Sequence, residues 1–266
     1  MMTDNNHVLL RQNDNGIAEL ILNRPEVHNA FDDQIIESLI SQLEHVDTND
    51  NIRVLILRSN GKNFSAGADL AWMKRMAKNS HQENLQDAGR LAKLMERLNN
   101  LSKPTIGLVQ GAAYGGAVGL AACCDIVIAS EDAQFCLSEV KIGLIPAVIS
   151  PYVVRAIGER QSRRFFLTAE AFSANTAKTF GLVHEVVATA DLFDDACARI
   201  TATLRRNSPQ GMRAAKDLIF AVSSKVIDQA VIDDTAKRIA DIRVSTEGQE
   251  GLSSFLEKRK PNWIQE

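Results

Sequence analysis

The chain has 266 residues, of which 45% are hydrophobic and 24% charged, and its formal net charge at pH 7 is −3. A folded chain of this length buries roughly three quarters of its unfolded surface, which is enough for a core that needs no disulfides. The composition excludes intrinsic disorder and a collagen-like fold. The small negative charge argues against binding to nucleic acid or to an anionic membrane through bulk charge.

The cysteines and the start of the chain indicate the expected compartment. Four cysteines occur, two of them adjacent, and no CxxC motif or Cys/His ligand spacing is present. This pattern disfavours a disulfide framework and a metal site. Residues 1–7 are polar and lack the basic and apolar regions of a secretory signal. We therefore expect a cytoplasmic protein without a metal ion.

The first part of the chain alternates strand and helix patterns. Strands are predicted where short apolar runs end at turn residues, and helices where apolar residues recur every three or four positions. In chain order these patterns predict a strand at 17–22, a helix capped by Asp32 or Asp33, a strand at 54–57, a helix through Trp72 and Met76, a helix at 82–99, a strand at 105–109, a helix at 117–123 and a strand at 126–129.

After Pro151 the pattern is almost entirely helical. Helices are predicted at 153–157, 160–168, 173–180, 193–207 and 209–223 and in a terminal segment that ends at Leu256. Strand–turn–helix units followed by such a region are typical of an α/β fold with a helical C-terminal part.

Residues 105–124 carry no charge over a length that would span a membrane. Five glycines interrupt this run, Pro104 precedes it, and Gln110 and Tyr114 add polar groups. These features favour a buried strand, a turn and a helix, so we expect no membrane association.

Two strand-to-helix turns, at 66–69 and 114–117, are rich in small residues. Small residues let a ligand approach the main-chain amides, and the N–H groups at a helix start have no partner within the helix. If both turns face one site, these amides form an oxyanion hole for a carbonyl oxygen that gains negative charge. On spacing alone, the simpler alternative is that the small residues only permit close helix packing.

Other catalytic signatures are absent from the sequence. There is no GxSxG, HExxH or GxxxxGK[ST] motif, and 111–119 has the wrong spacing for a dinucleotide fingerprint. The five histidines are scattered along the chain. The sequence therefore disfavours a metal-dependent or nicotinamide-dependent enzyme.

Three ordered motifs within the chain and two more near its ends carry a family resemblance. They are FSAGAD at 64–69, GAAYGGAVGLAACCD at 111–125 and FCLSEVKIG at 135–143, with NRP at 23–25 and FLEKRK at 255–260. Together they resemble the crotonase superfamily, the enoyl-CoA hydratases and isomerases. The resemblance implies an α/β crotonase-like spiral of ββα repeats over 1–200 and a helical C-terminal trimerisation region over 201–266. It also implies a homotrimer or a hexamer built from two trimers.

The same resemblance implies roles for individual residues. The oxyanion-hole amides are those of Ala68 and Gly116, in the two small-residue turns, and Glu139 is the general acid and base. The substrate is an acyl-CoA thioester, and neither a metal nor another cofactor is expected because coenzyme A arrives as part of the substrate. Substrate contacts are expected at Ala66, Asp69, Leu70, Ala71, Gly119 and Lys258, the last beside nucleotide phosphates together with Arg259 and Lys260.

One departure from the family pattern concerns a second carboxylate. Hydratases of this family typically use two glutamates around one water, and the first of these positions is Gly119 here. With Glu139 alone, moving a proton between carbon atoms is simpler than adding water. This departure favours a Δ3,Δ2-enoyl-CoA isomerase.

A closer resemblance favours hydration. The stretches GGAVGLAACCDIVIA and FCLSEVKIGLIPAVISPYVVRAIGER resemble bacterial methylglutaconyl-CoA hydratases of leucine degradation and their carboxygeranoyl-CoA relatives. Residues 147–151 replace the usual glycine-rich run and are expected to shape the pocket for a branched acyl group. The sequence therefore predicts a hydratase of a branched enoyl-CoA, with or without a distal carboxylate, and the isomerase is the alternative.

Three basic residues, Lys74, Arg75 and Lys78, follow the first small-residue turn. At spacings of three and four they share a helix face. Two interpretations are open: either one of these residues pairs with a distal carboxylate of the substrate, or all three belong to an ordinary solvated helix face. Some relatives of the hydratase bind RNA through a lysine-bearing helix here. With three basic residues and a net charge of −3, RNA binding is only a remote alternative, and nucleic acid is not an expected partner.

Overall fold

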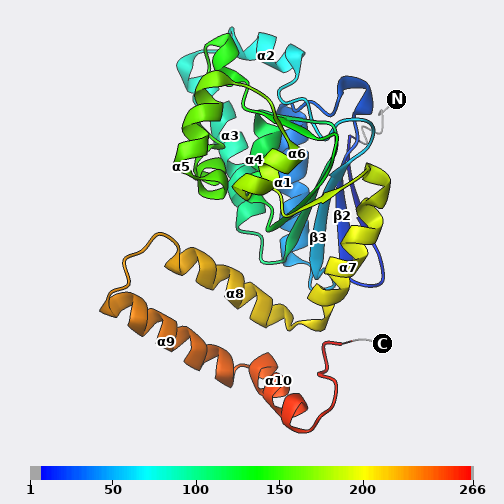
Figure 1. The fold of residues 1–266 in the computed structure, drawn as a ribbon, viewed down its shortest axis with the longest axis vertical. Helices are drawn as coiled ribbons and strands as arrows, with labels where there is room; N and C mark the ends of the chain where they lie inside the picture. The colour runs from blue at the N-terminus through cyan, green and yellow to red at the C-terminus, as the bar shows by residue number, and fades with distance from the viewer. Residues whose placement is uncertain (1–6, 265–266) are drawn as a thin grey trace. The chain divides into compact units, whose positions relative to one another are not determined.

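A computed structural model describes residues 7–264, and the chain divides into two compact units (Figure 1). The first unit holds the chain up to 101 together with 105–198, and the second holds 102–104 and the chain from 199 onward. Residues 1–6, on which most of the expectation about a secretory signal rests, lie outside the described part.

A six-stranded sheet forms the frame of the first unit, in the order β1-β2-β3-β4-β6-β9. The edge strand β1 pairs antiparallel with β2, and all other neighbours pair parallel. The strands span Val8–Gln12, Ile17–Leu22, Val54–Ser59, Thr105–Val109, Ile126–Ser130 and Glu185–Val187. All five residues of β4 are buried. Such continuous apolar burial is expected of parallel strands that are covered on both faces.

A second, smaller sheet explains the repeated turns. It consists of β5 (Ala112–Tyr114), β7 (Gln134–Cys136) and β8 (Phe172–Ser173). The strand β5 follows β4 after a two-residue turn and leads into the helix α4 (Gly116–Cys123), which makes one strand–strand–helix unit. This arrangement agrees with the predicted ββα pattern. The small sheet was not predicted from the sequence, because strands of two or three residues show no periodicity.

Helices of the first unit pack against one another in chain order. Contacts join α1 (Asp33–Thr48) to α3 (His81–Asn99), α3 to α4, and α4 to α5 (Ser150–Thr168). The Asp32 side chain caps α1 by accepting from the N–H of Ile35, so the first of the two predicted caps is correct. The short helix α2 (Leu70–Met76) follows the first small-residue turn.

The two helices predicted at 153–157 and 160–168 are confirmed. The element α5 consists of two helical parts that meet in a kink at Gly158, where the backbone is not helical and φ is 76°. A positive φ is open to glycine without a steric penalty, so the chain can turn there between the two helices. The remaining elements of the first unit are α6 (Ala174–Phe180) and three 3-10 turns, η1 (Pro25–Val27), η2 (Glu139–Ile142) and η3 (Ala190–Leu192).

The C-terminal part of the chain is helical, as predicted. It contains α7 (Phe193–Arg206), which crosses the boundary between the units, and then α8 (Pro209–Val222), α9 (Gln229–Val244) and α10 (Thr246–Leu256). The predicted terminal segment is two helices, because Ser245 ends α9 and its side chain caps α10 through the N–H of Gly248. In the second unit α9 contacts both α8 and α10.

The charge-free segment 105–124 is two strands and a helix. Among the helices that the structure describes, none has the length and hydrophobicity that a membrane span requires.

Candidate active site

The residues predicted to carry chemistry surround one cavity of about 580 Å³ in the first unit. We call it the central cavity. Its wall is made by both small-residue turns, by one side each of α2 and α3, and by the segment 138–149. The residues on this wall include Ala66, Ala68, Leu70, Trp72, Met73, Met76, Asn84, Asp87, Ala88, Leu91, Gly115, Gly116, Glu139, Lys141 and Ile149.

The first turn presents the amide of Ala68. On one side of it the Phe31 N–H donates to the Gly67 carbonyl at 2.8 Å, and on the other the Asp69 N–H donates to the Phe31 carbonyl at 2.7 Å. These two bonds hold the backbone of the turn, and Gly67 adopts a φ of 93°. The Ala68 N–H has no acceptor among residues 7–264. It is therefore available to a ligand oxygen in the cavity.

The second turn presents the amide of Gly116. The Gly115 N–H donates to the Cys136 carbonyl at 2.9 Å, and Gly116 is the first residue of α4. A first-turn N–H has no partner within its helix, and none of residues 7–264 accepts from that of Gly116. Gly115 has a φ of 55°, and a β carbon there would lie 3.2 Å from Glu139 Oε1. Glycine at 115 therefore allows both the turn and the close approach of Glu139.

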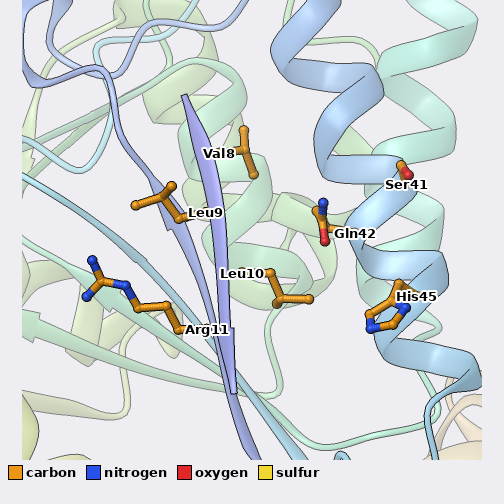
Figure 2. A pocket seen from close by; sticks show the side chains of 7 residues that line it. All are labelled: Val8, Leu9, Leu10, Arg11, Ser41, Gln42 and His45. Carbon is orange, nitrogen blue, oxygen red and sulfur yellow. The ribbon is translucent and has the colours of Figure 1, made fainter. Parts of the chain in front are cut away.

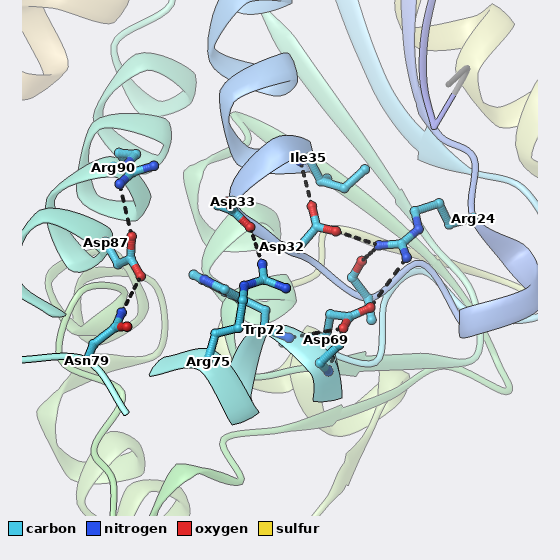
Figure 3. A network of polar contacts seen from close by, with 12 residues as sticks. Arg24, Asp32, Asp33, Ile35, Asp69, Trp72, Arg75, Asn79, Asp87 and Arg90 are labelled. Carbon is cyan, nitrogen blue, oxygen red and sulfur yellow. Dashed lines mark hydrogen bonds and ion pairs between the residues drawn. The ribbon is translucent and has the colours of Figure 1, made fainter. Parts of the chain in front are cut away.

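Arg24 holds the first turn in place through ion pairs with two aspartates (Figure 3). Its guanidinium donates to Asp32 Oδ2 at 3.2 Å and to Asp69 Oδ2 at 3.4 Å, and so joins the caps of α1 and α2. Asp69 Oδ1 accepts from the N–H groups of Ala71 and Trp72. Burial opposes ionisation of Asp69, but these N–H donors and Arg24 outweigh it and lower its pKa.

Two of the predicted substrate contacts, Asp69 and Ala71, stay predictions. Asp69 and Ala71 are not on the wall of the central cavity, whereas Ala66 and Leu70 are. The Asp69 carboxylate is occupied as a helix cap and as a partner of Arg24. Its place in the motif is therefore explained by the geometry of the turn that precedes α2.

Glu139 begins η2 and lines the central cavity. Its Oε2 atom is buried and has no hydrogen-bond partner in the structure. Burial raises the pKa of Glu139 above the usual value of 4.5, and a hydrogen bond with its own backbone offsets only part of this effect. A partly buried carboxyl with a raised pKa can both donate and accept a proton nearer to neutral pH.

Gly119, predicted to contact substrate, does not reach the cavity wall. A β carbon at this position would lie 2.3 Å from Ile149 Cγ2 and 3.2 Å from Met95 Sδ. Ile149 thus occupies the space in which a glutamate at 119 would extend. The packing therefore favours glycine at 119, and its contact with substrate stays a prediction.

Two helices supply wall residues that the sequence analysis missed. From α2 come Trp72, Met73 and Met76, and from α3 come Asn84, Asp87, Ala88 and Leu91. The α3 residues follow the i, i+3, i+4, i+7 spacing of one helix face. The sequence shows this spacing, but it does not predict that this face of α3 lines the same cavity as Glu139.

The basic residues of α2 do not line the central cavity. Lys74 and Lys78 are exposed, and Arg75 pairs with Asp33 at 2.5 Å. Of the described residues, Lys141 is the cation on the cavity wall. Lys141 is two residues from Glu139 in the FCLSEVKIG motif, but no sequence pattern indicated that its side chain lines the cavity.

The predicted phosphate-binding tail lies in the second unit. Arg259 makes hydrogen bonds to Glu250 and Glu257, which raise its pKa, and the same pairing lowers the pKa of Glu250 to about 2. Lys258 is exposed and has a left-handed backbone with a φ of 57°. Arg259 is therefore already paired within the tail, whereas the Lys258 ammonium has no salt-bridge partner within 7–264.

A larger hollow, of about 770 Å³, lies between β1 and α1 (Figure 2). Figure 2 shows Val8 and Leu10 pointing toward α1, while Leu9 and Arg11 point to the other side of the strand. It contains no carboxylate and none of the predicted residues. In the part of the chain described here, no three His, Cys, Asp or Glu side chains are grouped to hold a metal ion.

Two amides in turns that lead into helices, both without an acceptor among residues 7–264, line one cavity with a carboxyl group in a fold built on a mostly parallel sheet, and this combination defines a crotonase-type enzyme. A model of the family described as enoyl-CoA hydratase/isomerase matches residues 12–266. The chain therefore belongs to the enoyl-CoA hydratase/isomerase family.

Comparison with individual proteins supports this assignment. A crystal structure of an enoyl-CoA hydratase from Shewanella pealeana has a TM-score of 0.94 and 52% identity, covering 97% of this chain and 96% of its own. The 2,3-dehydroadipyl-CoA hydratase of Escherichia coli (strain K12) is 32% identical over 92% of this chain and 93% of its own length. A trans-2-decenoyl-[acyl-carrier-protein] isomerase of Streptococcus mutans is 31% identical over 94% of this chain and 95% of its own.

Proposed function

We propose that this protein adds water across the α,β double bond of a branched, carboxylated enoyl-CoA such as 3-methylglutaconyl-CoA, a step of leucine degradation in the cytoplasm. The observation that carries the proposal is that the amides of Ala68 and Gly116, both without an acceptor among residues 7–264, share one cavity with Glu139. The Escherichia coli relative, a hydratase of a dehydroadipyl-CoA, supports a carboxylated acyl group.

The two amides stabilise the thioester oxygen. Attack at the β carbon moves electrons onto the α carbon and the carbonyl, so the oxygen gains negative charge in the transition state. Fixed N–H donors aimed at this oxygen contribute about 10²–10³ each in rate. Because their turns are held by backbone bonds and by Arg24, the donors need little reorganisation during the reaction.

Glu139 transfers protons to and from the substrate. Its raised pKa favours the protonated form that a general acid needs. Glu139→Gln keeps the shape of the side chain but replaces the carboxyl group by an amide that neither donates nor accepts the catalytic proton. We therefore expect kcat to fall by about 10²–10⁴ with little change in folding. A variant that retains the wild-type rate would exclude Glu139 from the mechanism.

The acyl group lies along the apolar side of the central cavity, which Trp72, Met73, Met76 and Leu91 line. Lys141 is the cation available on this wall to a distal carboxylate. Coenzyme A enters as part of the substrate, and the reaction as proposed uses neither a metal nor a redox cofactor.

Assembly completes the proposal. The helices α8, α9 and α10 leave large apolar side chains exposed, which are Ile219, Ile232, Ile239, Val244, Leu252, Phe255 and Leu256. Exposed apolar surface of this extent indicates contact with another protein. We propose that these helices form a homotrimer, or a hexamer of two trimers, in which Lys258 meets the nucleotide phosphates of a bound substrate.

A second candidate, the isomerase, is favoured by one observation. The space beside Gly119 is filled by Ile149, so no second carboxylate stands where hydratases of the family place it. The Streptococcus mutans relative is an isomerase. With Glu139 alone, a proton can move between carbon atoms without any added water.

Labelled water separates the two reactions. Incubation with 3-methylglutaconyl-CoA and with crotonyl-CoA in ¹⁸O water places label on the β carbon if the protein is a hydratase. Unlabelled product with a shifted double bond, from a substrate that permits the shift, indicates an isomerase and refutes the proposed hydration.

A further inference from the structure

We infer that Asp87 is a second catalytic carboxylate of the central cavity, the group that binds and deprotonates the water that adds to the β carbon. The inference rests on the proposed hydration. It identifies the side chain that replaces the carboxylate absent at Gly119.

The cavity wall contains two carboxylates among the described residues, Glu139 and Asp87. They come from segments about fifty positions apart, Glu139 from η2 and Asp87 from α3. Because Ile149 fills the space beside Gly119, the second carboxylate available to a water in this cavity is Asp87 of α3.

The surroundings of the two carboxylates differ in the way that an acid and a base require. Glu139 has a buried oxygen without a partner, and its pKa is raised by burial. Asp87 is only 14% exposed and pairs with the Arg90 guanidinium at 3.1 Å. It also accepts a hydrogen bond from Asn79 Nδ2 at 3.4 Å (Figure 3). Glu139 is thus suited to donate a proton, and Asp87, held by Arg90 and Asn79, is the other carboxylate on the wall that can accept one.

Asp87 retains room for a water. One oxygen accepts from Asn79 and the other from Arg90, which leaves further lone pairs, because an ionised carboxylate offers about four acceptor sites. Asn84 is three residues earlier on the same face and also lines the cavity. Its side-chain amide is a second polar partner for a water that Asp87 holds.

The helix that carries Asp87 is well anchored. Ser80 and Glu83 form a capping box at the start of α3. Leu94, Met95 and Leu98 of the same helix are buried in the core. A carboxylate on such an element is held in place more firmly than one on a loop.

The water oxygen bonds to the β carbon, and the π electrons move onto the α carbon and the thioester carbonyl. Asp87 takes the proton that the water releases, and protonated Glu139 gives a proton to the α carbon. Asp87 then loses its proton to solvent and Glu139 regains one from solvent. One water is consumed, and both carboxylates return to their starting states.

Two reactions of the same cavity separate Asp87 from Glu139. Hydration of crotonyl-CoA needs the water. Exchange of the α protons of butyryl-CoA in D₂O needs the two amides and Glu139, but no added water. For Asp87→Asn we expect hydration to fall by about 10²–10⁴, while α-proton exchange stays within about twofold of the wild type. Glu139→Gln is expected to lose both reactions, and Asp87→Glu to recover part of the hydration.

The matched control is Asp234→Asn, which also removes an aspartate paired with an arginine on a helix and does not line the cavity. Circular dichroism confirms that each variant is folded. Equal loss of both reactions in Asp87→Asn would assign Asp87 a purely structural role and overturn the inference, as would wild-type hydration. A wild type that exchanges α protons but hydrates no enoyl-CoA overturns the proposed function, and the inference with it.

Discussion

Replacing Gly119 by alanine tests whether Ile149 closes the site of the absent carboxylate. A β carbon at 119 would lie 2.3 Å from Ile149 Cγ2 and 2.8 Å from Ile149 Cβ, distances that real contacts do not reach. Because the Cβ atom of Ile149 is itself too close, rotation of its outer atoms cannot relieve the clash. Ile149 is 2% exposed, so it has little space into which to move.

The magnitude follows from two opposing effects. Overpacking a well-filled core costs about 1–3 kcal/mol. Alanine in place of glycine within a helix gains up to about 1 kcal/mol. We therefore expect Gly119→Ala to lower the free energy of unfolding by about 1–2 kcal/mol, which at about 2–4 °C per kcal/mol lowers Tm by roughly 2–8 °C.

Gly89→Ala is the control, because Gly89 lies within α3 and a β carbon there meets nothing within 4 Å. This variant has the same propensity gain without the clash, so its free energy of unfolding is expected to rise by up to about 1 kcal/mol. Urea unfolding followed by circular dichroism measures both variants. Gly119→Ala as stable as Gly89→Ala would refute the reasoning. In an Ile149→Ala background the contact with Cγ2 is removed while the contact with Cβ remains, so the penalty at 119 is expected to become smaller, which a double-mutant cycle detects.

Three further predictions concern the cavity and its supports. Burial raises the Glu139 pKa above 4.5. The free energy of unfolding of the wild type relative to Glu139→Gln is therefore greatest below about pH 4.5 and falls as pH rises through the folded pKa. Urea titrations across this range measure the difference, and a difference that grows with pH would contradict the prediction. Arg24→Met leaves two aspartates without their shared cation and is expected to lower the free energy of unfolding by about 1–3 kcal/mol, measured in urea; an unchanged midpoint would show that Arg24 does not hold the turn. Lys141→Gln is expected to raise KM by about tenfold for 3-methylglutaconyl-CoA but not for crotonyl-CoA, with Lys74→Gln as control; an equal change for both substrates would remove Lys141 from carboxylate recognition.

Local patterns were sufficient for the elements that frame the site. The strand at 17–22 and the cap of α1 at Asp32 were predicted because side-chain alternation, helical spacing and capping involve residues only a few positions apart. The two turns were also readable, because small residues and unpartnered amides are local properties. The three-residue strands β5 and β7 were not, since pairing with distant partners determines them.

The sequence by itself indicated the groups that we propose to carry the chemistry, namely the amides of Ala68 and Gly116 and the carboxyl of Glu139, because family motifs and turn composition are written in consecutive residues. It also showed that position 119 holds no carboxylate. Only the tertiary structure decided that Ile149 fills that position, thirty residues further along. It likewise placed Asp87 and Lys141 on the wall that Glu139 shares. Neighbours of this kind come from the packing of helices and loops that are remote in the chain, and no periodicity within one segment specifies which face of another it will meet.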